Sequence, residues 1–166
     1  MADTLSVTGG AAQMLANKFE GKRKFRWILE INGIDSFMCK TASRPTMTWE
    51  VTTIDWINSK RYLAGKHEFE TLAVTLYDPI APSGAQQVME WVRLNFELVS
   101  GRSGYADFYK RDITLKMLDP VGTVVEVWDI KGAWPENVTM GDLDYASSDM
   151  AEISLTIRFD IAVLQF

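Results

Sequence analysis

Cysteine and histidine are scarce in this sequence, which has one of each, Cys39 and His67, among its 166 residues. One cysteine allows no disulfide within the chain, which argues against a disulfide-stapled secreted domain. The pair is also too small a set for a structural zinc site, which usually takes four such ligands. A catalytic triad would have to use His67, but its charged neighbours indicate a solvated strand face. Cys39 follows apolar residues, so we expect a buried thiol rather than a nucleophile.

Sequence signals of enzymes and of membrane insertion are also missing. The motifs GxSxG, HExxH, GxGxxG and GxxxxGK[ST] do not occur. No stretch reaches the roughly 18 consecutive apolar residues of a membrane helix, and the first 24 residues do not have the pattern of a signal peptide. We therefore expect no enzyme, no cofactor and no membrane anchor.

Positive charge is in deficit, with 17 Lys and Arg against 22 Asp and Glu and a formal net charge of −5. This balance argues against nucleic-acid affinity, which depends on cations that neutralise phosphates. The basic cluster at residues 22–26 is flanked by Glu20 and Glu30, which favours a solvated strand entry or a salt-bridge site for a neighbouring subunit. The acidic cluster of Asp142, Asp144, Asp149 and Glu152 has two interpretations, a calcium loop or a solvated loop, and its spacing favours the second.

What the chain does have is strand-like alternation over most of its length. Hydrophobic residues make up 47% of it, enough for one domain with a core. We expect an N-terminal arm at residues 1–23, either mobile or in contact with another subunit, and a β domain at 24–166. The arm has a short helical pattern at 11–19.

Several strands and turns follow from this alternation. Residues 25–31 predict a strand with Phe25 and Trp27 on its inner face, and Asn32 with Gly33 predicts a hairpin turn into a returning strand at 34–40. Residues 46–63 predict a long strand with a slip near Thr52. We expect its turn at Ala64 and Gly65 and its partner at 66–77.

The second half of the chain predicts one helix and three further strands. Ser83 reads as the N-cap of a helix at 84–99, with Gln86 completing a capping box. Strands are expected at 113–117 and 124–130 with a turn at 119–122 between them, and residues 131–135 are expected to end the second strand. Residues 152–161 alternate throughout, with Ile161 on the inner face, and predict one last strand.

The expected fold is therefore mainly β: an antiparallel β-sandwich or small barrel of about seven strands with one flanking α-helix. Such a sheet must hide its edges by closing, by packing or by pairing with another copy.

The order of several segments resembles the tail tube proteins of contractile phages of the T-even type. The segments are FRWILEING with FMCKTASRP, then FETLAVTLYD before a Gln-rich helix, then the corner Gly-Ala-Trp-Pro at 132–135, Leu-Asp-Tyr at 143–145, and a last strand ending in Phe159 and Asp160. The resemblance covers about residues 24–162. The long N-terminal stretch and the linker at 79–83 depart from the family pattern, so contacts of the arm cannot be carried over.

The resemblance implies a structural subunit whose hexameric rings stack into a hollow tube, each copy completing a multi-subunit β-barrel. DNA would pass through the channel without specific binding. The implied partners are further copies of the chain, the sheath protein, a baseplate or tube initiator, the tape-measure protein and the tail terminator. The implied location is the virion tail, assembled in the cytoplasm of the infected bacterium.

Three groups of residues are candidates for this assembly. Two small or semi-polar strand faces are candidates for the channel lining: Thr71, Ala73, Thr75, Ser154, Thr156 and Arg158. The expected hairpin tip is the candidate for contact between rings: Ile57, Asn58, Lys60, Arg61, Tyr62, Leu63, Ala64, Gly65 and Lys66. A structural corner without chemistry is expected at Gly132, Trp134 and Pro135.

Two kinds of alternative stay open. The tube of a tailocin, an extracellular contractile injection system or a type VI secretion system would share the fold. A monomeric ligand-binding β-barrel would instead have an apolar cavity.

Overall fold

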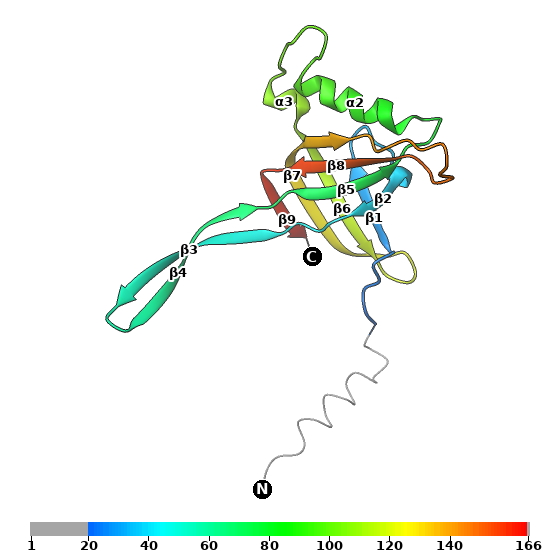
Figure 1. The fold of residues 1–166 in the computed structure, drawn as a ribbon. Helices are drawn as coiled ribbons and strands as arrows, with labels where there is room; N and C mark the ends of the chain where they lie inside the picture. The colour runs from blue at the N-terminus through cyan, green and yellow to red at the C-terminus, as the bar shows by residue number, and fades with distance from the viewer. Residues whose placement is uncertain (1–19, 166) are drawn as a thin grey trace.

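The computed structural model describes residues 20–165, and most of the expected arm, including its helical pattern, lies outside the described residues. The described part contains nine strands and three short or medium helices. Seven strands form one bent antiparallel sheet, and two form a separate hairpin that projects from the body (Figure 1). The bounds, in chain order, are β1 Trp27–Ile31, η1 Ser36–Met38, β2 Cys39–Ala42, β3 Met47–Trp56, β4 Ser59–Phe69, β5 Leu72–Tyr77, α2 Gly84–Asn95, α3 Ala106–Tyr109, β6 Arg111–Leu118, β7 Val124–Thr139, β8 Glu152–Arg158 and β9 Ile161–Gln165.

The seven-stranded sheet is bent into two layers that share β7. Sheet A contains β1, β6, the first part of β7 and β9. Sheet B contains β2, β5, β8 and the last part of β7. The pairings among the described strands close no barrel. The expected antiparallel, mainly β fold is confirmed, and its form is a sandwich.

Alternating apolar side chains from both layers fill the space between the sheets. Leu29 of β1, Leu72 of β5 and Ile157 of β8 are each 0% exposed and belong to one cluster. Side chains of a pleated strand alternate between faces, so strict alternation places one whole set in the core. The alternation fails at two expected inner positions, because Phe25 is 74% exposed and Ile161 is 46% exposed.

Helix α2 covers one end of the sandwich (Figure 1). The hydroxyl of Ser83 accepts a hydrogen bond from the Gln86 backbone N–H, as the N-cap prediction requires. Trp91 is a fully buried residue of α2, and its indole N–H donates to the Tyr109 carbonyl at 2.7 Å. The helix ends at Asn95, four residues before the expected end, and α3 was not predicted.

One expected hairpin is wrong, and a second exists with its turn at another position. Gly33 does form a turn at φ +85°, but η1 follows it and leads into β2, which pairs with β5 rather than with β1. The turn of the long hairpin lies between Trp56 and Ser59, not at Ala64 and Gly65. The strand expected at 66–77 is two strands, because β4 of the hairpin ends at Phe69 and β5 of the body begins at Leu72.

The expected slip of the long strand is displaced. The register of the hairpin shifts between Trp49 and Val51, opposite Gly65, while Thr52 and Thr53 pair regularly. A Cβ at Gly65 would lie 2.9 Å from the Glu50 carbonyl oxygen, so the close approach of the two strands explains the glycine there.

Residues 131–135 were expected to end a strand. In the structure the strand continues through them, and they carry β7 from sheet A to sheet B. Gly132 has φ +68° at this point, a conformation that favours glycine. The last strand changes layer beside it, because β8 ends at Arg158 and β9 begins at Ile161. Pro135 is tolerated because this part of β7 is an edge strand next to a bulge.

Candidate assembly surface

The outward face of sheet B brings the channel-lining candidates of two strands together. Ala73 lies opposite Thr156, and Thr75 lies opposite Ser154, on neighbouring antiparallel strands. Their side chains are exposed or half-buried, whereas the alternate residues of both strands face the core. Thr71 lies just before β5, so all of these candidates border one surface.

Both outer strands of sheet B extend this surface with residues that were not among the channel-lining candidates. Thr41 of β2 pairs with Thr75, and Asn137 and Thr139 of β7 pair with Thr156 and Ser154. We call this surface the small-residue face, defined by Thr41, Ala73, Thr75, Asn137, Thr139, Ser154 and Thr156. The β7 members were missed because the strand was expected to end at the corner. The alternation of Asn137, Val138 and Thr139 was the available signal.

Two ion pairs cross the small-residue face at its ends. The guanidinium of Arg158 donates to both carboxylate oxygens of Glu136, at 2.9 and 3.3 Å, and lies 3.8 Å from Glu68. The ammonium of Lys40 pairs with Glu152, and this hydrogen bond raises the pKa of Lys40. The charges on this face are therefore arranged in opposite-sign pairs.

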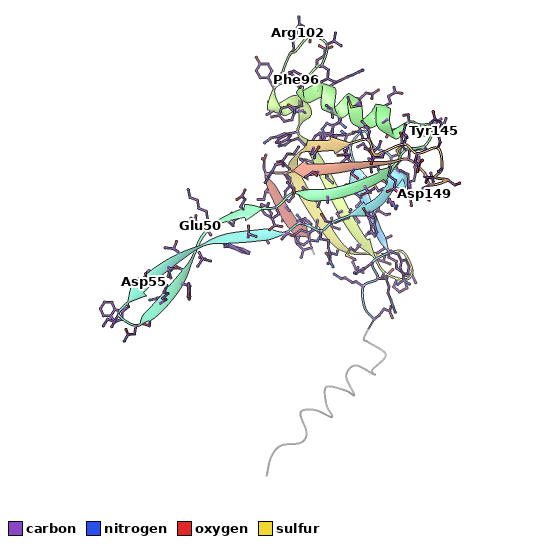
Figure 2. All side chains as sticks on the ribbon, in the orientation of Figure 1. Glu50, Asp55, Phe96, Arg102, Tyr145 and Asp149 are labelled. Carbon is purple, nitrogen blue, oxygen red and sulfur yellow. The ribbon has the colours of Figure 1, made fainter. Side chains whose placement is uncertain are left out.

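The β3–β4 hairpin is a two-stranded ribbon almost without buried side chains. Of its strand residues, Phe69 alone is buried. Trp56 is 72% exposed and Ile57 87% exposed at the turn. Figure 2 shows Glu50 about midway along this projection and Asp55 near its far end. An isolated two-stranded hairpin is marginally stable in water, so its apolar side chains are suited to contact with another molecule.

The ring-contact candidates are divided by the true position of the turn. Ile57 and Asn58 form the turn, and residues 60–63 lie near the start of β4, which begins at Ser59. Ala64 and Gly65 lie farther from the tip, near the register shift opposite Glu50.

Glu126 joins the hairpin base to the end of the N-terminal stretch. Its carboxylate is 7% exposed and accepts hydrogen bonds from Lys22, from Arg44 at 3.5 Å and from the Trp128 indole at 2.7 Å. Burial acts to raise the pKa of Glu126, but the hydrogen bonds from Lys22 and Trp128 and the nearby positive charges outweigh it, and the net pKa is lowered. Because Arg44 lies in the short link between β2 and β3, this carboxylate contacts both segments that extend from the body.

The side chains considered for catalysis or metal binding lie apart from one another. His67 is exposed on β4 with its ring 5.7 Å from that of Phe69. Cys39 points toward the core, and burial raises its pKa to about 11. In the acidic loop, the Asp144 carboxylate accepts from the Ala146 N–H, and no group of three metal-ligating side chains occurs in residues 20–165. Within the same residues, no helix is long and apolar enough to cross a membrane.

The interior of the sandwich does not match the ligand-barrel alternative. Side chains from both sheets and from α2 form its core cluster, in which Leu76 of β5, Val88 of α2 and Ile130 of β7 are fully buried. The hollows around sheet edges, such as one of about 720 Å³ beside β1 and β2, are open at the surface. A ligand-binding barrel would instead enclose a cavity between its sheets.

Comparison with known proteins agrees with these features. The model of the family described as T4-like virus tail tube protein gp19 matches residues 23–161. The tail tube protein of Serratia phage KSP90 is 29% identical over 126 residues, covering 74% of this chain and 71% of the relative.

Two solved structures share the fold at low sequence identity. The first is from the extended sheath–tube complex of the extracellular contractile injection system PVC, with a TM-score of 0.68 and 16% identity over 93% of this chain and 96% of the other. The second is from the six-fold symmetrised baseplate of the anti-feeding prophage, with a TM-score of 0.65 and 17% identity over 90% and 97%. The match over most of its length shows that this chain belongs to the T4-like tail tube protein family and is a structural subunit of a contractile phage tail.

Proposed function

We propose that six copies of this chain form a ring, that rings stack into a hollow tube, and that DNA passes through the tube without specific binding. We further infer a structural role with no catalysis. The observation that carries the proposal is the architecture of sheet B, which has four strands, a small-residue outward face and two outer strands with no further partner among the described residues.

Edge pairing between copies accounts for the open sheet. An unpaired strand edge exposes backbone N–H and C=O groups that pair readily with another chain. If β2 of one copy lies beside the last part of β7 of the next, every copy uses two different edges. Such a head-to-tail contact closes into a ring when the rotation closes. The small-residue face then becomes the inner wall, with four strands from each copy.

The projecting hairpin supports contact between successive rings. The hairpin extends away from sheet B (Figure 1), and exposed apolar side chains occur along its length, with Trp56 and Ile57 at its turn. We place the ring-to-ring contact at residues 57–63, which form the tip and the start of β4. Residues 64–66 belong to the same contact candidate but lie nearer the body.

The partners follow from the same role. A tube inside a contractile tail requires a sheath around it, a baseplate or initiator from which it grows, a tape-measure protein and a terminator. The sheath–tube complex and the baseplate named among the similar structures support the first two partners. The same structures favour the tube of an injection particle as the second candidate, and genome context separates the two.

The proposal is tested by purifying the protein, measuring its mass in solution and imaging it by negative-stain electron microscopy. We expect six-fold rings or hollow tubes, either spontaneously or after a baseplate seed is added. A monomer at every concentration, still monomeric with the seed, would refute the ring.

A further inference from the structure

The two ion pairs of the small-residue face are both built on β-bulges. In β2, Cys39 pairs with Leu76 and Thr41 pairs with Thr75, so Lys40 is an extra residue. A bulge is a local feature that re-aims side chains, and it is found often at sheet edges. Here the extra residue reaches across β5 to Glu152 at the start of β8.

The opposite outer strand repeats this arrangement with the charges reversed. In β7, Pro135 pairs with Ile157 and Asn137 pairs with Thr156, so Glu136 is the extra residue. Its carboxylate reaches Arg158 at the end of β8. Each outer strand of sheet B therefore contributes one bulged, charged residue to a pair with the central strand β8.

The pairing occupies the guanidinium of Arg158. Two of its nitrogens donate to Glu136 in a fork-to-fork geometry, at 2.9 and 3.3 Å, and the third lies 3.8 Å from Glu68. The same planar set of donors is what makes arginine a strong ligand for phosphate. While Glu136 holds it, a passing phosphate must compete with a carboxylate for those donors.

Apart from these pairs, the small-residue face is uncharged. Its members are Thr, Ser, Ala and Asn, so Lys40 and Arg158 are the cations on the outward side of β2, β5, β8 and the last part of β7. Both cations are paired within the face.

We propose that Glu136 and Glu152 mask Arg158 and Lys40, so that the small-residue face offers no free cation to DNA phosphates. This rests on the proposed function, because the face meets DNA only if it lines the channel. Glu136 is a positioning residue that acts through Arg158. The mask matters because free cations repeated around a ring would bind DNA together. Each phosphate that they neutralise would steepen the fall of log affinity with log salt concentration by about 0.9.

The test compares DNA binding by the purified full chain and by Glu136→Gln. The probe is a fluorescent duplex of about 20 base pairs, followed by anisotropy over a salt series. We expect no measurable binding by the wild type. At low salt we expect Glu136→Gln to bind the duplex at least about tenfold more tightly than the weakest binding that the assay detects. This binding should be lost as the salt concentration rises.

Two matched variants separate unmasking from a change in net charge. Glu30→Gln makes the same charge change and frees Lys116, which pairs with Glu30 at 2.7 and 2.8 Å on sheet A. It should bind DNA much less than Glu136→Gln. The double variant Glu136→Gln with Arg158→Gln should return to the wild-type level.

The proposal is overturned if Glu136→Gln binds no better than the wild type, if Glu30→Gln binds equally well, or if the double variant keeps the binding. If Glu136→Gln does not fold, Glu152→Gln frees Lys40 and makes the same test at the other pair. Imaging the same wild-type sample keeps the two claims distinct. Rings or tubes without a DNA effect overturn the mask alone, whereas a wild type that never assembles overturns the proposed function.

Discussion

Replacing Gly132 by alanine should measurably lower the free energy of unfolding, because this residue lies where β7 changes layer. At this residue β7 passes from sheet A to sheet B with φ +68°. A Cβ here would lie 2.1 Å from Oδ2 of Asp160 and 2.8 Å from its Cγ. The same carboxylate accepts two hydrogen bonds from the Lys110 ammonium, at 2.9 and 2.7 Å. The new methyl group therefore has to displace a paired side chain.

Two terms add up to the expected loss. A non-glycine residue in the left-handed region costs roughly 1–2 kcal/mol. Moving Asp160 away from Lys110 costs a further ~0.2–1 kcal/mol, because the pair is largely solvent-exposed. The expected decrease in the free energy of unfolding is therefore about 2 kcal/mol. For a chain of this size it corresponds to a melting temperature lower by about 4–8 °C.

Gly122→Ala is the matched control for this experiment. Gly122 has φ +90°, but a Cβ there meets nothing within 4 Å, so only the backbone term applies. Urea unfolding followed by tryptophan fluorescence, at a concentration where the free subunit is monomeric, compares the two variants. Equal or smaller destabilisation by Gly132→Ala would refute the argument from the Asp160 contact.

Further predictions concern the hairpin, the arm anchor and the thiol. Tyr62→Ser, at an exposed position of the proposed ring contact at 57–63, should leave the melting temperature within about 2 °C but shorten or abolish tubes in electron micrographs; normal tubes would argue against that segment as the ring contact. Gly65→Ala should distort the hairpin through its contact with the Glu50 carbonyl and also reduce assembly, and unchanged tube yield would count against that. Because the pKa of Glu126 is lowered in the folded state, its contribution is present above the ordinary value of 4.5 and is lost as pH falls through the folded pKa. Glu126→Gln should therefore flatten the decline of unfolding free energy in that acidic range, and an unchanged pH profile would contradict the assignment. The thiol of Cys39, with its pKa raised to about 11, should react with a thiol reagent at pH 8 at least about tenfold more slowly in the folded than in the unfolded chain, and equal rates would argue against its burial.

Local patterns were sufficient for the parts of this fold that have local causes. Residues of β8 alternate strictly, and Ile153, Leu155 and Ile157 are buried as the pattern predicts. The start of α2 depends on Ser83 and its short-range hydrogen bond, so its position was predictable. The turn at Asp119 was predictable for the same reason, since the carboxylate accepts from two nearby backbone N–H groups.

Strand partners and the hairpin turn were not predictable in this way. The dipeptide at Gly33 formed its turn, but whether the following strand pairs with β1 or β5 depends on contacts distant in sequence. The real turn of the long hairpin uses Ile57 at φ +46°, a conformation that β-branched residues rarely adopt. The Ala-Gly pair at 64–65 gave the stronger turn signal, but its glycine serves a close approach within the ribbon.

The residues of the candidate surface on the two central strands, β5 and β8, could be predicted, whereas those on the outer strands, β2 and β7, were missed. The alternation of β5 and β8 predicted that Thr75 and Thr156 share a polar face. The bulges that bring Lys40 and Glu136 to this face could not be predicted from the sequence pattern. One inserted residue interrupts the two-residue alternation by which a strand is recognised.

A cryo-EM reconstruction of the assembled tube would show directly which sheet lines the channel. We expect a ring in which β2 of one copy lies beside the last part of β7 of the next, with Thr75 and Thr156 facing the channel. A ring whose inner wall is formed by the outward face of sheet A, with Thr114 toward the channel, would contradict it.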